Sequence, residues 1–407
     1  MPHPRDKNFS LRHLSVFSTV AALGRISGAS ETLSRSPSAV SRSVAIVEER
    51  FGRTLLTRSL EGVAPTPEGE LVAARCDIIK RELATLRDAL FAENSGDLRP
   101  NASVFDMHVD VSRLRALIAV HDFGSVQRAC QLLGISQPAV SVSINHLESD
   151  LGLRLFSRTP SGMIATPAGI AATLCFKRVL SELRKITDDV ESYNSPSSGL
   201  VCVGGLAYSR TALLPEALKR ALRALPRTVV RTVEGPIQVL LGAMHAGDVD
   251  FLICAHPNPE LLEGVAVEPI KPDPMRLFVS ADHPLADRAA LSAEEVAQFP
   301  FVLPPFGSVT RGLLDRVFMD EVGRPPTGSV ETSSSAIIRY LLLHSRQISF
   351  RSTREFEAEC DTGRIRALDL AFDLPDRSIC VLQRCGVRHT AAVTEFLDLV
   401  RDVAGEA

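Results

Sequence analysis

Apolar residues recur with helical spacing near the start of the chain. Leu14, Phe17 and Val20 lie three residues apart and so share one face of a helix. A second short helix is predicted to end at Leu33, and a third to begin after Ser36. The same pattern returns 100 residues further on, which indicates an internal repeat.

The two copies stay in register from Leu14 to Gly69 without a gap. Over these positions, 18 residues are identical to the residue 100 positions later. The identities fall on helix, turn and loop positions alike, which chance similarity does not produce. They include Gly24/Gly124, Ala29/Ala129, Ser36/Ser136, Ala39-Val40-Ser41/Ala139-Val140-Ser141, Gly52/Gly152, Arg58/Arg158 and Thr66-Pro67/Thr166-Pro167.

A three-residue turn precedes the third helix of each copy. Ser36 and Ser136 are expected to cap these helices, with Pro37 and Pro138 in the first turn, where a missing N–H does no harm. Two helices joined by such a turn form a helix-turn-helix, whose second helix enters the major groove of DNA. A helical hairpin with a solvated polar face is the alternative, but it does not explain the cap, the following hairpin and the repeat together.

A small hairpin is predicted after each third helix. Gly52 and Gly152 are expected to end these helices, and the next segment forms a wing that places Arg58 and Arg158 near a phosphate backbone. The Thr-Pro pair that follows caps a further helix in each copy.

Polar side chains are expected at the exposed start of each third helix, with Ser43 and Ser143 among them. Gln and Asn can pair bidentately with adenine, Arg with guanine, and Ser with phosphate or base. The candidate contacts to double-stranded DNA are Arg35, Ser36, Pro37, Ser38, Ser41, Arg42 and Arg58 in the first copy, and Ser136, Gln137, Pro138, Ser141, Asn145 and Arg158 in the second.

A long helix is predicted after each Thr-Pro pair. Apolar residues from Val72 to Leu90 are spaced alternately by four and three positions, and so are those from Ala172 to Val190. A sustained stripe of this kind requires another helix. The two helices can pair within one chain, because the connector at 93–108 is long enough to join them. Pairing between chains is the alternative.

Each copy resembles the DNA-binding domain of the LysR-type transcriptional regulators. The first copy departs from the family pattern at Pro37-Ser38, Val47 and Leu56. A single such domain is usual in the family, so the duplication is the main departure. The second copy carries the pattern at Ser136–Ser141, Leu147-Glu148, Gly152, Leu155-Phe156-Ser157-Arg158 and Thr166-Pro167-Ala168-Gly169.

The C-terminal half alternates strand and helix patterns. Apolar strands are expected at 200–204, 228–233 and 250–254, which predicts a parallel α/β sheet. A second set begins near Met275, and a strand at 377–383 is expected to return to the first. This arrangement resembles the two-lobed effector domain of the LysR family, which is similar to periplasmic binding proteins. The resemblance also implies antiparallel linker helices.

The fold class is therefore α/β overall, with two N-terminal winged helix-turn-helix domains. The predicted domains are a first winged helix-turn-helix with its linker helix at 9–92, a connector at 93–108, a second such domain at 109–192, a hinge at 193–199, and an effector domain at 200–405, with lobe 1 at about 200–274 and 375–405 and lobe 2 at about 275–374.

Polar helix starts in the effector domain are candidates for a ligand site. Ligands in open α/β sheets lie beyond the carboxyl ends of strands, where helix N-termini favour anions. Arg210 and Arg311 could clamp a carboxylate. The alternatives are simple helix capping for each Ser and a surface position for each Arg. The candidate effector-binding residues are Ser209, Arg210, Thr211, Gln238, Ser308, Thr310, Arg311, Ser333 and Ser334.

The net charge of −3 is unusual for a DNA-binding protein. Phosphate contacts, however, depend on local charge. Residues 9–60 contain seven Arg and three Glu, whereas residues 109–160 contain five Arg and four acidic residues. The first copy is therefore expected to contribute more of the phosphate contact.

The sequence gives little evidence for a metalloprotein, an enzyme or a membrane protein. The eight cysteines form no CxxC and lack an accompanying His cluster, so buried free thiols in a reducing cytosol are expected, without a metal or cofactor. Phosphate-loop, GxSxG and HExxH motifs are absent, and no catalytic residue or enzyme activity is expected. No apolar run could span a bilayer and no signal peptide is recognised, so the cytoplasm is the expected location.

The sequence thus predicts a regulator that binds duplex DNA, senses a small organic acid and forms a homo-oligomer. The alternative is a ligand-binding or scaffolding protein whose duplicated domain mediates protein contacts. Salt-dependent binding to duplex DNA would separate the two, because neutralising phosphates releases counterions.

Overall fold

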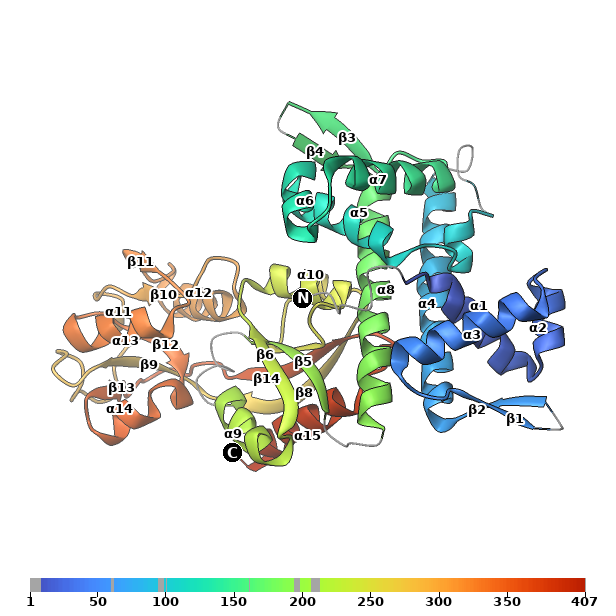
Figure 1. Cartoon of the computed structure of the whole chain (residues 1–407). Coiled ribbons are helices and arrows are strands. Elements are labelled where there is room, and N and C mark those ends of the chain that lie inside the picture. Colours follow the sequence, from blue (N-terminus) through green and yellow to red (C-terminus); the bar gives the residue numbers. More distant parts are fainter. Residues whose placement is uncertain are drawn as a thin grey trace. The chain divides into compact units, whose positions relative to one another are not determined.

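The computed structural model describes residues 9–59, 62–93, 99, 101–160, 162–193, 198–205 and 213–406. The chain divides into two compact units (Figure 1). The N-terminal unit comprises Met1–Gly199 with His245–Asp248, and the C-terminal unit comprises Leu200–Met244 with Val249–Ala407.

The N-terminal unit contains the same set of elements twice. Each element of the second set begins and ends within one residue of the point 100 positions after its counterpart, which confirms the predicted repeat of helices and wing. The first set is α1 (Leu11–Leu23), α2 (Ile26–Thr32), α3 (Pro37–Phe51), β1 (Leu56–Ser59), β2 (Gly62–Pro65) and α4 (Pro67–Glu93); the second is α5 (Val111–Phe123), α6 (Val126–Leu133), α7 (Gln137–Leu151), β3 (Phe156–Thr159), β4 (Gly162–Ala165) and α8 (Pro167–Ser192).

Local sequence signals determine the ends of α3 and α7. The Ser36 and Ser136 hydroxyls accept hydrogen bonds from the backbone N–H groups three residues later, at 3.3 and 3.4 Å. Gly52 and Gly152 adopt φ of 65° and 76°, a left-handed conformation that favours glycine, and end the helices. The predicted caps and stops are confirmed.

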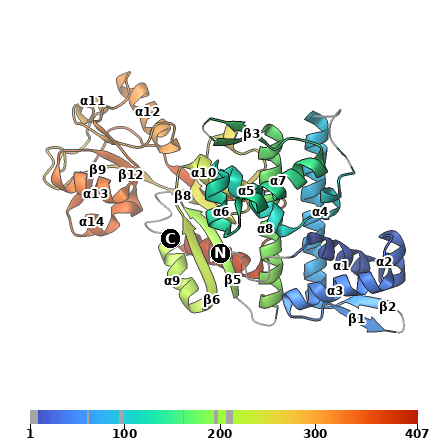
Figure 2. The ribbon, with the colours of Figure 1, turned by 45° about the horizontal axis from the view of Figure 1, so that its top comes forward.

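Helices α4 and α8 pack against each other within the chain, and both views show them side by side (Figures 1 and 2). Their predicted apolar stripes are buried in one continuous core that includes both helix-turn-helix modules. The pair is antiparallel, because Arg75 contacts Glu182 and Asp189 while Glu82 contacts Cys175 and Arg178.

A buried charge cluster crosses the α4–α8 interface. The Arg75 side chain is fully buried and donates from Nε to Asp189 at 2.9 Å and from Nη1 to Glu182 at 2.8 Å. Lys185 Nζ lies 3.4 Å from Glu182. The position 100 residues after Arg75 holds Cys175, so the cluster occurs once and breaks the symmetry of the repeat.

The two modules also meet at the starts of α1 and α5. Leu11 N–H donates to the Val109 carbonyl at 2.9 Å, and Val111 N–H donates to the Phe9 carbonyl at 3.0 Å. Adding 100 to one residue number of each bond and subtracting 100 from the other turns each bond into the other. The two modules are therefore related by an approximate twofold axis. The connector, predicted as a loop, contains the 3-10 helix η2 (Ser103–Asp106), which Asp150 holds through Ser103 and the Val104 N–H.

The C-terminal unit contains two lobes, and its elements alternate as predicted over much of their length. Of the expected hinge, residues 194–197 lie outside the described residues, and 198–199 belong to the first strand. The elements are β5 (Ser198–Gly205), α9 (Leu214–Ala224), β6 (Arg227–Val233), α10 (Ile237–Ala246), β7 (Phe251–Ala255), η4 (Pro259–Leu261), β8 (Val265–Asp273), β9 (Met275–Ser280), α11 (Ala293–Val296), β10 (Val302–Leu303), α12 (Val309–Val322), β11 (Val330–Glu331), α13 (Ser335–His344), β12 (Ser349–Ser352), η5 (Thr353–Phe356), α14 (Glu357–Asp361), β13 (Ile365–Ala367), β14 (Arg377–Arg384) and α15 (Ala391–Glu406).

The predicted parallel pairing is confirmed for β5 and β7, but the sheet of the first lobe as a whole is mixed. The first lobe has the strand order β6-β5-β7-β14-β8, in which β5 and β7 are parallel but β14 is antiparallel to both β7 and β8. In the second lobe, β9 pairs antiparallel with β12 and β13, and β10 pairs parallel with β11. Strand β8 leads the chain out of the first lobe, and β14 leads it back. Neither strand is reached through a helix that crosses over within that lobe, which is the connection that parallel strands require.

Candidate functional site

The start of α3 presents most of its predicted DNA-contacting residues to solvent. Ser36, Pro37, Ser38, Arg42 and Arg58 are exposed, and Arg35 and Ser41 are partly exposed. Ser43 is only 4% exposed, which corrects the expectation of an exposed residue. It lies three residues after buried Val40 and therefore on the inner face of the helix.

The start of α7 has the same arrangement. Ser136, Gln137, Pro138, Asn145 and Arg158 are exposed, and Ser141 is partly exposed. The hydroxyls of the two N-cap serines accept backbone N–H bonds, so their first role is to end the turn and start the helix.

Each wing is tied to its helix by a glutamate whose role the motif alone did not reveal. The Glu48 carboxylate accepts from the N–H groups of Leu55 and Leu56 at 2.8 and 3.2 Å. In the second module Glu148 accepts from the N–H groups of Leu155 and Phe156 at 2.8 and 3.3 Å. The wing therefore keeps a defined position beside the third helix.

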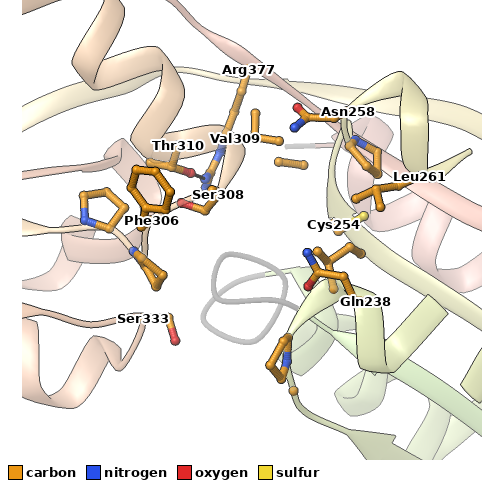
Figure 3. Close-up of a pocket in the computed structure, with 18 of the residues that line it drawn as sticks. Gln238, Cys254, Asn258, Leu261, Phe306, Ser308, Val309, Thr310, Ser333 and Arg377 are labelled. Carbon is orange, nitrogen blue, oxygen red and sulfur yellow. Dashed lines mark hydrogen bonds between the residues drawn. The ribbon is translucent and has the colours of Figure 1, made fainter. Parts of the chain in front are cut away.

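The C-terminal unit contains a cavity of about 520 Å³ between its lobes. Four predicted effector-binding residues line it, and Figure 3 shows Gln238 on the first lobe opposite Ser308 and Thr310 on the second. Ser333 also lines it. The predicted residues Ser209, Arg210 and Thr211 lie outside the described residues.

Arg311 and Ser334 are not among the residues that line the cavity. Arg311 Nε donates to Asp315, one turn along α12, at 2.8 Å, and its Nη1 lies 3.5 Å from Glu331. Ser334 caps α13 by accepting from the Ile337 N–H. The predicted carboxylate clamp therefore lacks support at Arg311, whose guanidinium is engaged by acidic residues of its own lobe.

Two other arginines line the cavity, and the sequence patterns had not singled them out. Arg377 begins β14, the strand that returns from the second lobe, and Arg351 lies in the buried strand β12. Arg377 donates to Asp273 at 2.5 Å and to the Thr310 hydroxyl at 2.7 Å. The strand that holds Arg351 reads Ser-Phe-Arg-Ser, and nothing in that sequence marks Arg351 as a buried cation.

Arg351 is 4% exposed, and its guanidinium keeps unused hydrogen-bonding capacity. Its Nη2 donates to the Thr332 carbonyl at 3.2 Å, whereas its Nε has no hydrogen-bond partner among the described residues. Burial lowers the pKa of Arg351, the charge of Glu355 opposes that change, and the charge of Arg377 adds to it. An anion in the cavity would meet the buried cation of Arg351, whereas the nearby Arg377 is already paired with Asp273.

Within the described residues, no group of three His, Cys, Asp or Glu side chains could hold a metal ion, and no helix is long and apolar enough to cross a membrane. Five of the eight cysteines are buried, and burial raises the pKa of Cys76 and of Cys254 to about 12, which disfavours thiolate formation.

Comparisons with known proteins agree with this architecture. The family model of the LysR substrate binding domain matches residues 194–405. The model described as "Bacterial regulatory helix-turn-helix protein, lysR family" matches twice, at residues 11–70 and 111–170.

Among curated proteins, the HTH-type transcriptional regulator GalR of Pseudomonas putida is 30% identical over 397 residues, 98% of each chain. The uncharacterized regulator YdcI of Escherichia coli is 26% identical, over 74% of this chain and 97% of its own. The likeness to GalR therefore includes both modules, whereas YdcI leaves about a quarter of this chain unmatched.

Two solved structures share the fold. A full-length variant of OxyR from Pseudomonas aeruginosa has a TM-score of 0.55 at 21% identity, covering 73% of this chain and 95% of that one. CbnR in complex with its target DNA has a TM-score of 0.52 at 18% identity, covering 72% and 100%. With both domain models matched and a relative aligned end to end, this chain belongs to the LysR family of DNA-binding transcriptional regulators, with a C-terminal substrate-binding domain.

Proposed function

We propose that one chain reads two halves of a single DNA site with its two helix-turn-helix modules, called head 1 (Leu11–Pro65) and head 2 (Val111–Ala165). The antiparallel α4–α8 pair carries one head at each end. A helix of the 27 residues in α4 is roughly 40 Å long at 1.5 Å per residue. That length is close to the ~34–36 Å between half-sites one helical turn of DNA apart.

The observation that carries the proposal is the equivalence of the two heads. The helices α3 and α7 have the same length, cap and stop, and their starts are open to solvent. We expect the protein to act in the bacterial cytoplasm as a homo-oligomer.

Arg42→Ala is expected to weaken binding of the full chain to its site by about 1–3 kcal/mol, because an exposed Arg at this position can pair with guanine. The site would first be located by footprinting the DNA upstream of neighbouring genes, and affinities would be measured by fluorescence anisotropy at fixed salt. Arg223→Ala removes the same charge from an exposed position on α9 and should leave the affinity unchanged. Equal affinities for the Arg42 variant and the native chain would contradict the role of head 1.

For the cavity, we propose a small anionic organic ligand. The volume of about 520 Å³ suits a small molecule, and the buried Arg351, whose Nε has no hydrogen-bond partner among the described residues, supplies a cation for a carboxylate. Polar groups from both lobes face the same space, so a bound acid would favour one arrangement of the lobes and thereby change the affinity for DNA.

Organic acids that bind should raise the thermal midpoint of the full chain, since a ligand at 100 times its Kd stabilises the folded state by about 2.7 kcal/mol. Arg351→Gln should weaken such binding roughly tenfold or more, because it removes a charged hydrogen-bond donor from the cavity. Arg311→Gln is the matched control and should retain binding, since Arg311 does not line the cavity. Stabilisation by neutral or cationic compounds alone would refute the anion site.

A further inference from the structure

The two heads fold alike but present different chemistry to DNA. Helices α3 and α7 run over equivalent residues and bury equivalent faces. In the turn before each helix, however, Arg35 of head 1 corresponds to Ile135 of head 2, and on the helix itself Arg42 corresponds to Val142. The difference therefore lies in the exposed side chains and not in the fold.

Head 2 exposes apolar groups where a DNA-binding surface usually carries charge. Ile135 is 40% exposed, Val142 is 52% exposed and Leu132, on the preceding helix, is 63% exposed. Gln137 and Asn145 are exposed on the same helix as Val142, and Arg158 is exposed on the wing. The surface thus combines apolar groups, amide side chains and a nearby cation.

The major groove contains one apolar recognition group, the C5 methyl of thymine. Amide side chains such as Gln137 and Asn145 match the N6 and N7 edge of adenine, and thymine is its partner base. Arg42 matches the O6 and N7 edge of guanine. Each surface therefore fits a different base composition.

We propose that the two heads read unlike half-sites. Head 1 reads a half containing a guanine contacted by Arg42, and head 2 reads an adenine- and thymine-containing half in which Val142 contacts a thymine methyl. This inference rests on the proposed function, in which both heads bind DNA. The apolar surface of head 2 could otherwise dock a protein. DNA is favoured because Val142 occupies the position of Arg42 and lies three residues before the exposed Asn145, on the same face of the helix.

The test uses the full chain and base analogues placed in one half of the site at a time. Footprints of Arg42→Ala and Gln137→Ala assign each half to a head. Replacing thymines by deoxyuracil removes only the methyl groups and should weaken binding about fourfold per contacted methyl, in the head 2 half alone. Replacing guanines by 7-deazaguanine removes N7 and should weaken binding about tenfold, in the head 1 half alone.

Variants of the protein test which side chain is responsible for the effect of each base analogue. Val142→Ala should abolish the deoxyuracil effect and retain the 7-deazaguanine effect, and Arg42→Ala should do the reverse. The double variant Ile135→Arg/Val142→Arg should make the second half sensitive to 7-deazaguanine. All these residues are at least partly exposed, so thermal midpoints should stay close to that of the native chain.

Three results would overturn the proposal: equal analogue effects in both halves, no deoxyuracil effect in the head 2 half, or a deoxyuracil effect that persists in Val142→Ala. The second result would favour a protein-docking surface at Val142. A chain that binds no DNA at any salt concentration would instead refute the proposed function.

Discussion

Arg75→Ala should lower the free energy of unfolding of the N-terminal unit by about 3–5 kcal/mol, the usual cost of removing one partner from a buried ion pair. The variant leaves the carboxylates of Glu182 and Asp189 buried beside a cavity, with side chains 1% and 8% exposed. Lys185 lies 3.4 Å from Glu182, so a single cation would face two buried carboxylates. We expect α4 and α8 to separate at lower denaturant concentrations.

The charge of Arg75 is firmly held in the folded chain. Burial acts to lower the pKa of Arg75, but its hydrogen bonds and charge interactions with Asp189 and Glu182 outweigh this and hold the pKa above its ordinary value. Replacing all four members of the cluster, Arg75, Glu182, Lys185 and Asp189, by leucine removes the charges together with their partners. That quadruple variant should therefore be close to the native chain in stability.

Hydrogen exchange of peptides from α4 and α8, followed across a denaturant series, measures this effect in the unit concerned. Arg87→Ala is the control, because the Arg87 side chain is 42% exposed and its partner Asp88 is 69% exposed. It should change the stability by less than about 0.5 kcal/mol. A similar small change for Arg75→Ala would show that the α4–α8 contact does not depend on the cluster.

Gly169→Ala should destabilise the second module by about 3 kcal/mol, a large value for overpacking. A Cβ at this position would lie 2.0 Å from the Leu155 carbonyl oxygen, which is backbone and cannot rotate away. The same carbonyl accepts the Thr166 N–H at 3.0 Å, so moving it would break the bond that joins the wing to α8. Gly69 meets the Leu55 carbonyl oxygen at the same 2.0 Å, and Gly69→Ala should behave alike.

Gly312→Ala provides a contrast, because Gly312 lies within α12 and a Cβ there meets nothing within 4 Å. Alanine should be neutral or stabilising by up to ~1 kcal/mol at such a helical position. Thermal unfolding followed by circular dichroism would report both changes. Equal midpoints for Gly169→Ala and the native chain would show that the wing shifts freely, which contradicts a tight contact.

Local signals predicted the N-terminal unit well. Ser36 and Ser136 cap their helices and Gly52 and Gly152 end them, because each of these interactions lies within a few residues along the chain. Because the repeat is in register, a helix start or stop predicted in one module could be compared with the equivalent position of the other module. Ser43 was misplaced because exposure depends on which side of a helix packs, and that side is set by the rest of the fold.

Predictions failed where distant segments meet. Strand β8 contains Pro269 and Pro272, and prolines in a sequence normally indicate that the segment is not a strand. It nevertheless forms a strand, because it lies at the edge of its sheet, where proline is tolerated. The return of β14 to the first lobe was predicted correctly, but its antiparallel direction was not. That direction depends on the path of the chain through the second lobe, which no neighbouring residue determines.

The repeat, the helix starts and stops and the amphipathic stripes follow from the order of residues alone, since they depend on neighbours a few positions away. The choice of chemical partners depends on the folded chain. Arg75 meets Asp189 across 114 positions, and Arg377 meets Asp273 across 104. A buried charge is stable only beside an opposite one, so the tertiary fold decides that Arg75 joins two helices while Arg351 and Arg377 face a cavity.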